Sequence, residues 1–436
     1  MTEESFDPKI HLTYTPPTTK YTFDDLSLAQ FPTATPIAAS TPFPFLTPAG
    51  ILAYRKALTS PAIAHHCAHS PYKNTLVLRN VAKYSSFIHD LWTHPETLRI
   101  IADVAGVPLV PIMKYEIGHT NIQANGTSVE EMLSELTAEP ATSTVEVTEA
   151  EKSQDPVSGR SVIPWHYDSY PYVLIVMLSH TTGMYGGETC LRTGDGSALK
   201  IITPPIGHAI FLQGGEIQHL ASRAIGTTER ITTITSLRAT TPGLYDNSYL
   251  TNVRPESDLG VLYREWVRYR VAKVVEEMGY FEGMLEGGDE KVDVETVHRV
   301  LETQIGYLRR TVDQVVSYEL HDAVIGKYGV HAYYAAEEYW EQVQKCAGFG
   351  ELVRMSEEKR EFRPGSRLWA DLYASRMMVE NGGVLRGQVG VVKWDNERDY
   401  VMGDELLRQG LREVFWEWVG VVGLDELLEV SDLSEL

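Results

Sequence analysis

Residues 161–241 decide the fold: they begin SVIPWHYDSYPYVLIVMLSH and end TTERITTITSLRATT. Apolar residues recur here with a period of two, interrupted by turns such as Gly186-Gly187 and Pro204-Pro205. A period of two indicates half-buried β-strands, because successive side chains point to opposite faces. Several short strands at close spacing predict a sandwich or a jelly-roll barrel. The candidate strands are Val173–Leu178, Thr189–Arg192, Leu199–Thr203, His208–Leu212, Gln218–Ala224 and Arg230–Arg238.

Three side chains in this stretch combine the chemistry of metal ligands with a spacing that can bring them together. His166 and Asp168 are two residues apart, so on a strand they point to one face about 6.6 Å apart. His219 lies on a later candidate strand and can bring a second imidazole to the same point. Two nitrogens and one oxygen on one side of a metal leave the other side open, as in the facial triad of non-haem iron enzymes. We therefore expect a metal centre in which these three residues are ligands and catalytic residues; the alternative is a satisfied polar core.

Composition narrows the classes of protein. The chain has 436 residues, of which 43% are hydrophobic and 22% charged, which is ordinary for a globular protein. A formal net charge of −21 disfavours nucleic acid and anionic membranes as partners, since both repel it. The acidic start, Met1 to Ser5, lacks the apolar segment of a secretory signal, and the three cysteines are too scattered for a disulfide framework. We expect a cytoplasmic protein.

Three regions are expected along the chain. Residues 1–60 are rich in Pro and Thr, which predicts an extended arm and one short helix, Ile51–Leu58. Residues 61–250 are expected to form the jelly-roll core, and residues 251–436 a mainly helical region packed on it. Helical spacing predicts long helices near 263–278 and 294–315, capped by Asp258 and Asp293. Further predictions are short helices at Phe87–Trp92 and Pro95–Val104 (capped by Thr93 or His94) and at Asp404–Val419, strands at Thr75–Leu78 and Val110–Gln123, and a hairpin at Val384–Trp394.

Two segments flank the expected centre. Along Val110–Gln123 an apolar row becomes polar at His119, Asn121 and Gln123, which is typical of a strand that lines the mouth of a barrel pocket; a half-exposed edge strand is the alternative. Residues 126–157 contain eight acidic residues against one basic residue. This predicts a long surface insertion with a short helix near Val129–Leu136, either a solvated loop or a lid.

The ordered set His166-x-Asp168, Gly186-Gly187-Glu188-Thr189, His219 and Arg230 resembles the Fe(II)/2-oxoglutarate-dependent oxygenases. The resemblance covers roughly residues 105–241, and the flanks look like fungal members from secondary metabolism. The segment Thr41-Pro42-Phe43-Pro44-Phe45 is similar to members that act on amino acids, including aziridine formers.

The resemblance implies a double-stranded β-helix core, α+β overall, with the N-terminal arm and an extensive C-terminal helical layer. It also implies Fe(II) on His166, Asp168 and His219, with 2-oxoglutarate and O2 as co-substrates. Arg230 would bind the distal carboxylate of 2-oxoglutarate beside Thr232, since a guanidinium offers paired donors. Arg223 and Arg238 are the rivals for that role. The reaction would oxidise an unactivated C–H bond of a small metabolite, with an amino acid as one class, by hydroxylation, desaturation or ring closure, giving succinate and CO2.

Substrate contacts are expected from four residues near the metal centre. Two are polar residues of a neighbouring strand, and two are aromatic residues close to the triad, for which a place in the core is the alternative. They are Asn121, Gln123, Trp165 and Tyr172.

Other interpretations remain. His65-His66-Cys67-x-His69 is a competing metal cluster, although it lacks further ligands at suitable spacing. A cupin-like metalloenzyme that uses O2 without 2-oxoglutarate would keep the triad but not need Arg230. A non-catalytic jelly-roll protein would bind no iron.

Overall fold

The structure, a computed structural model, describes residues 3–28, 35–72, 74–124, 128–152, 163–244, 246, 248–250, 253–286, 291–315 and 318. These residues belong to one compact unit, Met1–Tyr318. The predicted hairpin at Val384–Trp394 and helix at Asp404–Val419 lie outside the described residues. No helix in the described part is both long enough and apolar enough to cross a membrane.

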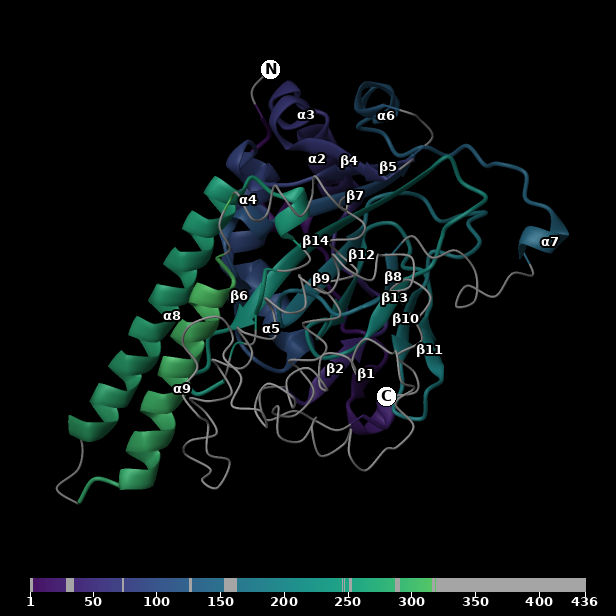
Figure 1. Cartoon of the computed structure of the whole chain (residues 1–436). Helices are drawn as coiled ribbons and strands as arrows, with labels where there is room; N and C mark the ends of the chain where they lie inside the picture. The colour runs from purple at the N-terminus through teal and green to yellow at the C-terminus, as the bar shows by residue number, and fades with distance from the viewer. Residues whose placement is uncertain are drawn as a thin grey trace, which may run out of the picture. The chain divides into compact units, whose positions relative to one another are not determined.

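Two antiparallel sheets form the centre of this unit (Figure 1). The larger sheet has the order β1-β2-β12-β9-β14-β7-β5-β4, with β3 paired to β12 and β6 to β14; the smaller has the order β11-β10-β13-β8. The strands of the larger sheet are β1 (Lys20–Thr22), β2 (Ile37–Ser40), β3 (Phe43–Pro44), β4 (Ala68–Tyr72), β5 (Thr75–Leu78), β6 (Leu109–Pro111), β7 (His119–Ala124), β9 (Tyr172–Met177), β12 (His208–Leu212) and β14 (Glu229–Ala239). Those of the smaller sheet are β8 (Ile163–His166), β10 (Thr189–Arg192), β11 (Ala198–Ile201) and β13 (His219–Ala221).

Strand alternation divides the core into two layers. On β9 and β12, Val173 and Ile210 join a cluster with Leu191 of the smaller sheet, so one face of the larger sheet packs against that sheet. Their neighbours Leu174 and Phe211 join a second cluster with the N-terminal helices. We call the face toward the smaller sheet the inner face.

Helices cover the other face. They are α1 (Pro8–His11), α2 (Pro48–Leu58), α3 (Pro61–Cys67), α4 (Ser86–Thr93) and α5 (Pro95–Ala105), with the 3-10 turn η2 (Val81–Lys83). The 3-10 turn η1 (Asp24–Leu26) lies instead on the inner side, where Leu26 joins the cluster with Leu191. Tyr54 of α2 and Trp92 of α4 are fully buried in the second cluster. Proline occupies the first turn of α2 and α5, where a missing N–H costs nothing, and His94 caps α5 by accepting from the Glu96 N–H. The predicted helices and His94 as the cap are therefore confirmed.

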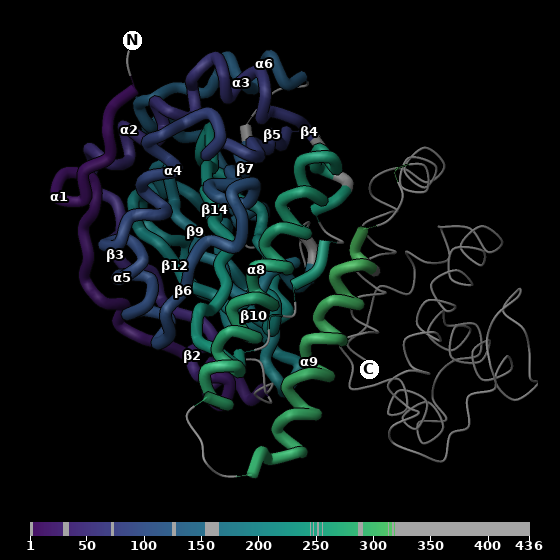
Figure 2. The backbone as a smooth tube through the Cα atoms, turned by 90° about the vertical axis from the view of Figure 1, so that its left-hand side faces the viewer, coloured from purple at the N-terminus to yellow at the C-terminus, as the bar shows by residue number. Residues whose placement is uncertain are grey.

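Two long helices complete the unit: α8 (Leu259–Glu286), which follows η4 (Arg254–Glu256), and α9 (Val294–Asp313). They lie side by side as a hairpin in both views (Figures 1 and 2). Trp266 and Leu262 of α8 pack with Met113 and Tyr170 in a third apolar cluster. Asp258 and Asp293 accept hydrogen bonds from first-turn N–H groups, as the sequence predicted.

Two predictions need correction. The N-terminal arm was expected to be extended and without regular structure. Instead it contains β1, β2 and β3, which add strands to the larger sheet. The single strand predicted at Val110–Gln123 is divided into β6, the turn η3 (Lys114–Glu116) and β7. Gly118 makes this break with φ of 71°, and a Cβ there would lie 2.7 Å from the Tyr54 hydroxyl, so the position requires glycine.

The acidic segment contains α6 (Val129–Glu135), close to the predicted helix, and α7 (Glu149–Lys152), which was not predicted. Residues 126–127 and 153–157 of this segment lie outside the described part of the chain.

Candidate metal centre

The smaller sheet brings two histidines together. His166 is the last residue of β8 and His219 the first of β13, and their Cα atoms are direct partners across the antiparallel pair. His219 is also the partner of Leu191, whose side chain lies in the core between the sheets. Directly opposed residues share a face, so both imidazoles face the larger sheet.

Asp168 is held by the backbone just before β13. Its N–H donates to the carbonyl of Gly214 at 2.8 Å. A Cβ at Gly214 would lie 1.8 Å from Asp168 Oδ2, so only glycine lets the carboxylate occupy this position. Sequence reasoning missed Gly214, although the pair Gly214-Gly215 directly before Glu216 marked a close approach of two backbones.

The three side chains converge. His166 Nε2 and His219 Nε2 each lie 3.6 Å from Asp168 Oδ1. One ligand atom from each residue lies within 4.8 Å of the others. Two ligands bound at right angles, each about 2.1 Å from a metal, are about 3 Å apart, so this separation suits a shared ion.

Electrostatics also suit a cation. His219 Nδ1 lies 2.9 Å from the Ile217 carbonyl and donates to it, which directs the lone pair of Nε2 toward the cluster. Burial alone would raise the pKa of Asp168, but His219 and His166 hold it well below its usual range. The Asp168 side chain is 23% exposed, so the cluster is reachable from outside.

Arg230 and Thr232 lie on the inner face of β14. Arg230 Nη2 donates to the Gly187 carbonyl at 3.2 Å, and its buried Nε has no hydrogen-bond partner among the described residues. Burial lowers the pKa of Arg230 to about 10, although the charge of Glu188 acts to raise it. The guanidinium forms no ion pair with any residue of the described part of the chain. The rivals differ: Arg238 forms a paired contact with Glu276, and Arg223 is exposed. Arg230 is thus a cation that no acid of the described residues binds.

The four residues predicted to contact substrate separate into two pairs. Asn121 and Gln123 lie on the inner face, as Cα partners of Thr232 and Arg230. Gln123 donates from Nε2 to the Ala224 carbonyl at 2.9 Å, joining the two sheets.

Trp165 and Tyr172 are not brought to the cluster, which corrects the expectation for both. Trp165 precedes His166 on β8 and so points to the opposite face, where the Arg192 guanidinium lies 4.7 Å from its ring. Tyr172 is 2% exposed and packs with Phe211 in the cluster on the helix side of the larger sheet.

The competing histidine cluster does not converge. His66 stacks on Tyr84 at 4.7 Å, while His69 pairs with Glu256 at 3.7 Å. Burial raises the pKa of the Cys67 thiol to about 12, which disfavours a thiolate ligand. Among the residues that the structure describes, the group that could hold a metal is His166, Asp168 and His219.

Sequence reasoning also missed Tyr249, which holds both neighbours of Asp168. Its N–H donates to the Ser169 carbonyl at 2.9 Å and its hydroxyl to the Tyr167 carbonyl at 3.1 Å. Arg310 of α9 donates to the adjacent Ser248 carbonyl at 3.1 Å. No local pattern in the sequence marked Tyr249, because its partners are backbone atoms far away in the chain.

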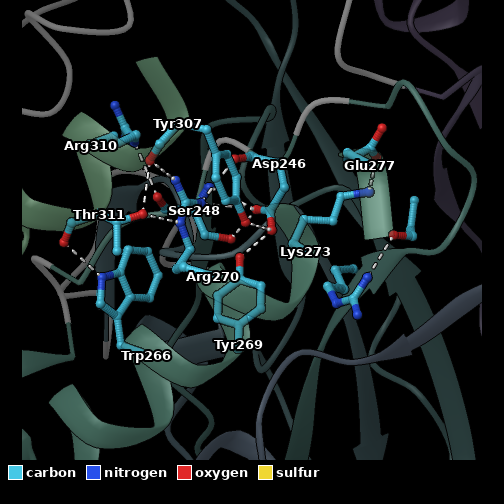
Figure 3. Close-up of polar contacts among 12 residues, drawn as sticks. Asp246, Ser248, Trp266, Tyr269, Arg270, Lys273, Glu277, Tyr307, Arg310 and Thr311 are labelled. Carbon is cyan, nitrogen blue, oxygen red and sulfur yellow. Dashed lines mark hydrogen bonds and ion pairs between the residues drawn. The ribbon is translucent and has the colours of Figure 1, made fainter. Parts of the chain in front are cut away.

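A buried polar cluster between α8 and α9 supports this segment (Figure 3). Asp246 accepts from the Tyr269 hydroxyl, from the Tyr307 hydroxyl at 3.2 Å and from the Ser248 N–H at 3.0 Å. Arg270 donates to the Asp246 carbonyl at 3.1 Å. Because Asp246 is buried and accepts hydrogen bonds from residues of both α8 and α9, it fixes the backbone that leads to Tyr249.

Comparison with known proteins finds no matching family model and no matching curated protein. Solved structures give distant similarities. The epimerase SnoN from nogalamycin biosynthesis, described as non-heme and alpha-ketoglutarate-dependent, is 16% identical over 45% of this chain and 75% of its own, with a TM-score of 0.30. HygX from Streptomyces hygroscopicus, crystallised with nickel, 2-oxoglutarate and hygromycin B, is 14% identical over 48% and 85%, at 0.28. A Pseudomonas putida prolyl-4-hydroxylase is 12% identical over 45% and 89%, at 0.26. TM-scores of this size establish neither a shared fold nor a shared function.

Proposed function

We propose that this protein is an Fe(II)- and 2-oxoglutarate-dependent oxygenase that oxidises an unactivated C–H bond of a small metabolite. The observation that carries the proposal is the convergence of His166, Asp168 and His219 on one side of a common point. Two imidazoles and one carboxylate are the donor set of non-haem iron oxygenases that keep open positions.

The strand order supports a double-stranded β-helix. Consecutive strands of the core, β9 to β14, are distributed over both sheets, and β8 and β13, which bear the histidines, are neighbours in the smaller sheet. In this proposal the inner face of the larger sheet forms one wall of the active site.

Each residue has a definite task in the proposed site. His166, Asp168 and His219 would hold Fe(II), and the hydrogen bond from His219 Nδ1 to the Ile217 carbonyl keeps Nε2 available as a ligand. When bound, the iron with 2-oxoglutarate and O2 would supply an oxidant able to attack a C–H bond, with succinate and CO2 as co-products.

Arg230 would bind the distal carboxylate of 2-oxoglutarate, because its guanidinium carries charge without an acid partner among the described residues. The Thr232 hydroxyl lies two residues along the same strand face and would add one more donor. Fixed donors orient the co-substrate and so reduce the entropy that must be lost before reaction.

Amino acids are the first class of substrate to test, and the natural setting proposed is secondary metabolism in the cytoplasm. The polar inner face, with Asn121 and Gln123 beside Arg230, supports a polar substrate rather than a hydrocarbon. The acidic surface, with a net charge of −21, supports small molecules rather than nucleic acids as partners.

The test is succinate formation by protein loaded with Fe(II) under anaerobic conditions and then exposed to O2 with a metabolite library. Omitting iron or 2-oxoglutarate should abolish substrate-linked succinate, and so should His166→Ala in a variant that still folds. Substrate oxidation that continues without 2-oxoglutarate would favour a cupin-like metalloenzyme. Failure of the wild type to retain iron would favour a binding protein.

A further inference from the structure

A chain of polar contacts ends on the inner face of the larger sheet. Arg79 donates through Nη2 to Glu116, which also accepts from the Tyr170 hydroxyl at 3.1 Å. Arg79 Nη1 lies 3.3 Å from His119 Nδ1, and His119 Nε2 lies 3.0 Å from Asn121 Oδ1. Glu116 and Arg79 are almost completely buried, so the start of this chain is fixed within the core.

The direction of each hydrogen bond in the chain is determined. A guanidinium can only donate, so His119 Nδ1 must accept from Arg79. Burial and the charge of Arg79 lower the pKa of His119 to about 3, so the ring is neutral and its proton lies on Nε2. His119 Nε2 therefore donates to Asn121, and the atom that faces His119 must be the amide oxygen.

The amide orientation leaves a donor unused. With Oδ1 of Asn121 engaged, its NH2 group is directed elsewhere, and no acceptor for it is found among the residues that the structure describes. Asn121 is half-buried, and its side chain lies on the face that carries Thr232 and Arg230. A donor fixed in orientation and left without a partner is suited to recognise a ligand atom.

This donor lies on the wall that the metal cluster faces. The two sheets are joined near Arg230. There Arg230 donates to the carbonyl of Gly187, just before β10, and Gln123 donates to the carbonyl of Ala224, just after β13. From Ala224 the chain leads back along β13 to His219. Leu191, the Cα partner of His219, shares a core cluster with Ile234, which lies two residues beyond Thr232 on β14. The metal cluster therefore lies from that junction in the direction of Thr232 and Asn121.

We propose that Asn121, oriented by Glu116, Arg79 and His119, binds an acceptor oxygen, a carbonyl or carboxylate, of a ligand held beside the His166, Asp168 and His219 cluster. The proposal rests on the proposed function, and it defines the ligand as one with an oxygen that the amide N–H can reach. Two sources have this chemistry: 2-oxoglutarate itself and a primary substrate such as an α-amino acid.

Asn121→Asp is the informative variant, because it keeps the shape and the acceptor for His119 but replaces the NH2 donor with an anionic oxygen. Asn74→Asp is the matched control: it adds the same charge in the β4–β5 turn, where Asn74 has φ of 61°, a conformation that Asp tolerates. Thermal unfolding of both full-length variants should match the wild type to within a few degrees.

Calorimetry on the anaerobic Fe(II) protein gives the first comparison, with 2-oxoglutarate as the probe. The second uses the Fe(II) and 2-oxoglutarate complex with the standard L-α-amino acids, each paired with the amine that lacks its carboxylate. Loss of a charge-assisted hydrogen bond weakens binding by about 10- to 100-fold.

A rise of this size in the dissociation constant of 2-oxoglutarate for Asn121→Asp, but not for Asn74→Asp, assigns Asn121 to the co-substrate. The second possible result is that the dissociation constant of 2-oxoglutarate is unchanged, while an amino acid that binds the wild type no longer binds Asn121→Asp and its amine binds neither protein. This result assigns Asn121 to the substrate. No change in either comparison overturns the proposal. A wild type that fails to bind 2-oxoglutarate would instead contradict the proposed function, so the two failures are distinguishable.

Discussion

Arg230 is the residue on which the distinction between 2-oxoglutarate chemistry and other O2 chemistry depends. Its guanidinium is half-buried and donates to a carbonyl oxygen. It forms no ion pair with a carboxylate of the described part of the chain. A cation in such a place lowers the free energy of the folded protein only when an anion joins it. The co-substrate's distal carboxylate is that anion in the proposed function.

Arg230→Ala should raise the 2-oxoglutarate requirement by about 10- to 100-fold, because charge-assisted hydrogen bonds are lost. Succinate formation at varied 2-oxoglutarate measures this as a higher KM, with metal affinity unchanged. The exposed Arg223→Ala is the control and should behave as wild type. An unchanged KM in Arg230→Ala would transfer the role to another residue.

Gly214 sets the position of Asp168. Because a Cβ at residue 214 would lie 1.8 Å from Asp168 Oδ2, Gly214→Ala must displace the carboxylate. We expect metal affinity to fall by about 10- to 100-fold, the loss typical when the support of a ligand is removed. Equilibrium binding of Mn(II) or Co(II) measures it.

The control is Gly279→Ala on α8, where an added Cβ meets nothing within 4 Å. It should leave metal affinity unchanged. Equal affinities for Gly214→Ala and the wild type would show that Asp168 does not ligate from its present position.

At the scale of elements, the helical hairpin α8–α9 reaches the metal centre through Tyr249. The buried cluster around Asp246 fixes the backbone before Tyr249, and Tyr249 fixes the carbonyls on either side of Asp168 (Figure 3). The helices therefore contribute to the geometry of a ligand that lies on another element.

Tyr249→Phe removes the hydroxyl that binds the Tyr167 carbonyl and keeps the ring. One lost hydrogen bond corresponds to about three- to tenfold in affinity, so the Mn(II) dissociation constant should rise by that factor. Tyr280→Phe removes a hydroxyl at an exposed position of α8 and should leave metal affinity unchanged. If both variants bind Mn(II) as the wild type does, Tyr249 has no positioning role.

Element by element, the sequence was informative where the pattern is local. The period of two located β9, β10, β12 and β14 to within a residue or so of each end, because both faces of these strands are specified by burial. It failed along Val110–Gln123, where the tertiary approach of Tyr54 to Gly118 breaks the strand. It also failed for the N-terminal arm, where β2 and β3 pair with β12 and β1 pairs with β2, contacts that depend on tertiary structure.

In the candidate site, too, the residues that follow a local pattern could be predicted from the sequence. Side-chain alternation predicted that His166 and Asp168 lie close together, and a later strand supplied His219. In the structure, however, Asp168 lies beyond the end of β8, where Gly214 leaves room for its carboxylate. Alternation could also have excluded Trp165, since it directly precedes His166 on β8. Tyr249 could not be found in this way, because its contacts depend on how α8 and α9 meet the sheets.

At the scale of the whole molecule, the described chain is two sheets with helices on the outer face and a hairpin that reaches the cluster. A metal that binds only the folded form must stabilise it. At a free metal concentration 100 times the dissociation constant, the free energy of unfolding should rise by about 2.7 kcal/mol. Thermal unfolding with and without Mn(II) measures this, and Asp168→Ala should show no such rise.

The most direct measurement is anaerobic titration of Fe(II) into the full-length wild type and the Asp168→Ala and His219→Ala variants. We expect one Fe(II) per chain in the wild type and no comparable binding in either variant, with circular dichroism showing the same fold in all three. Equal iron binding by wild type and variants, or none by the wild type, would contradict the assignment of His166, Asp168 and His219 as the metal centre.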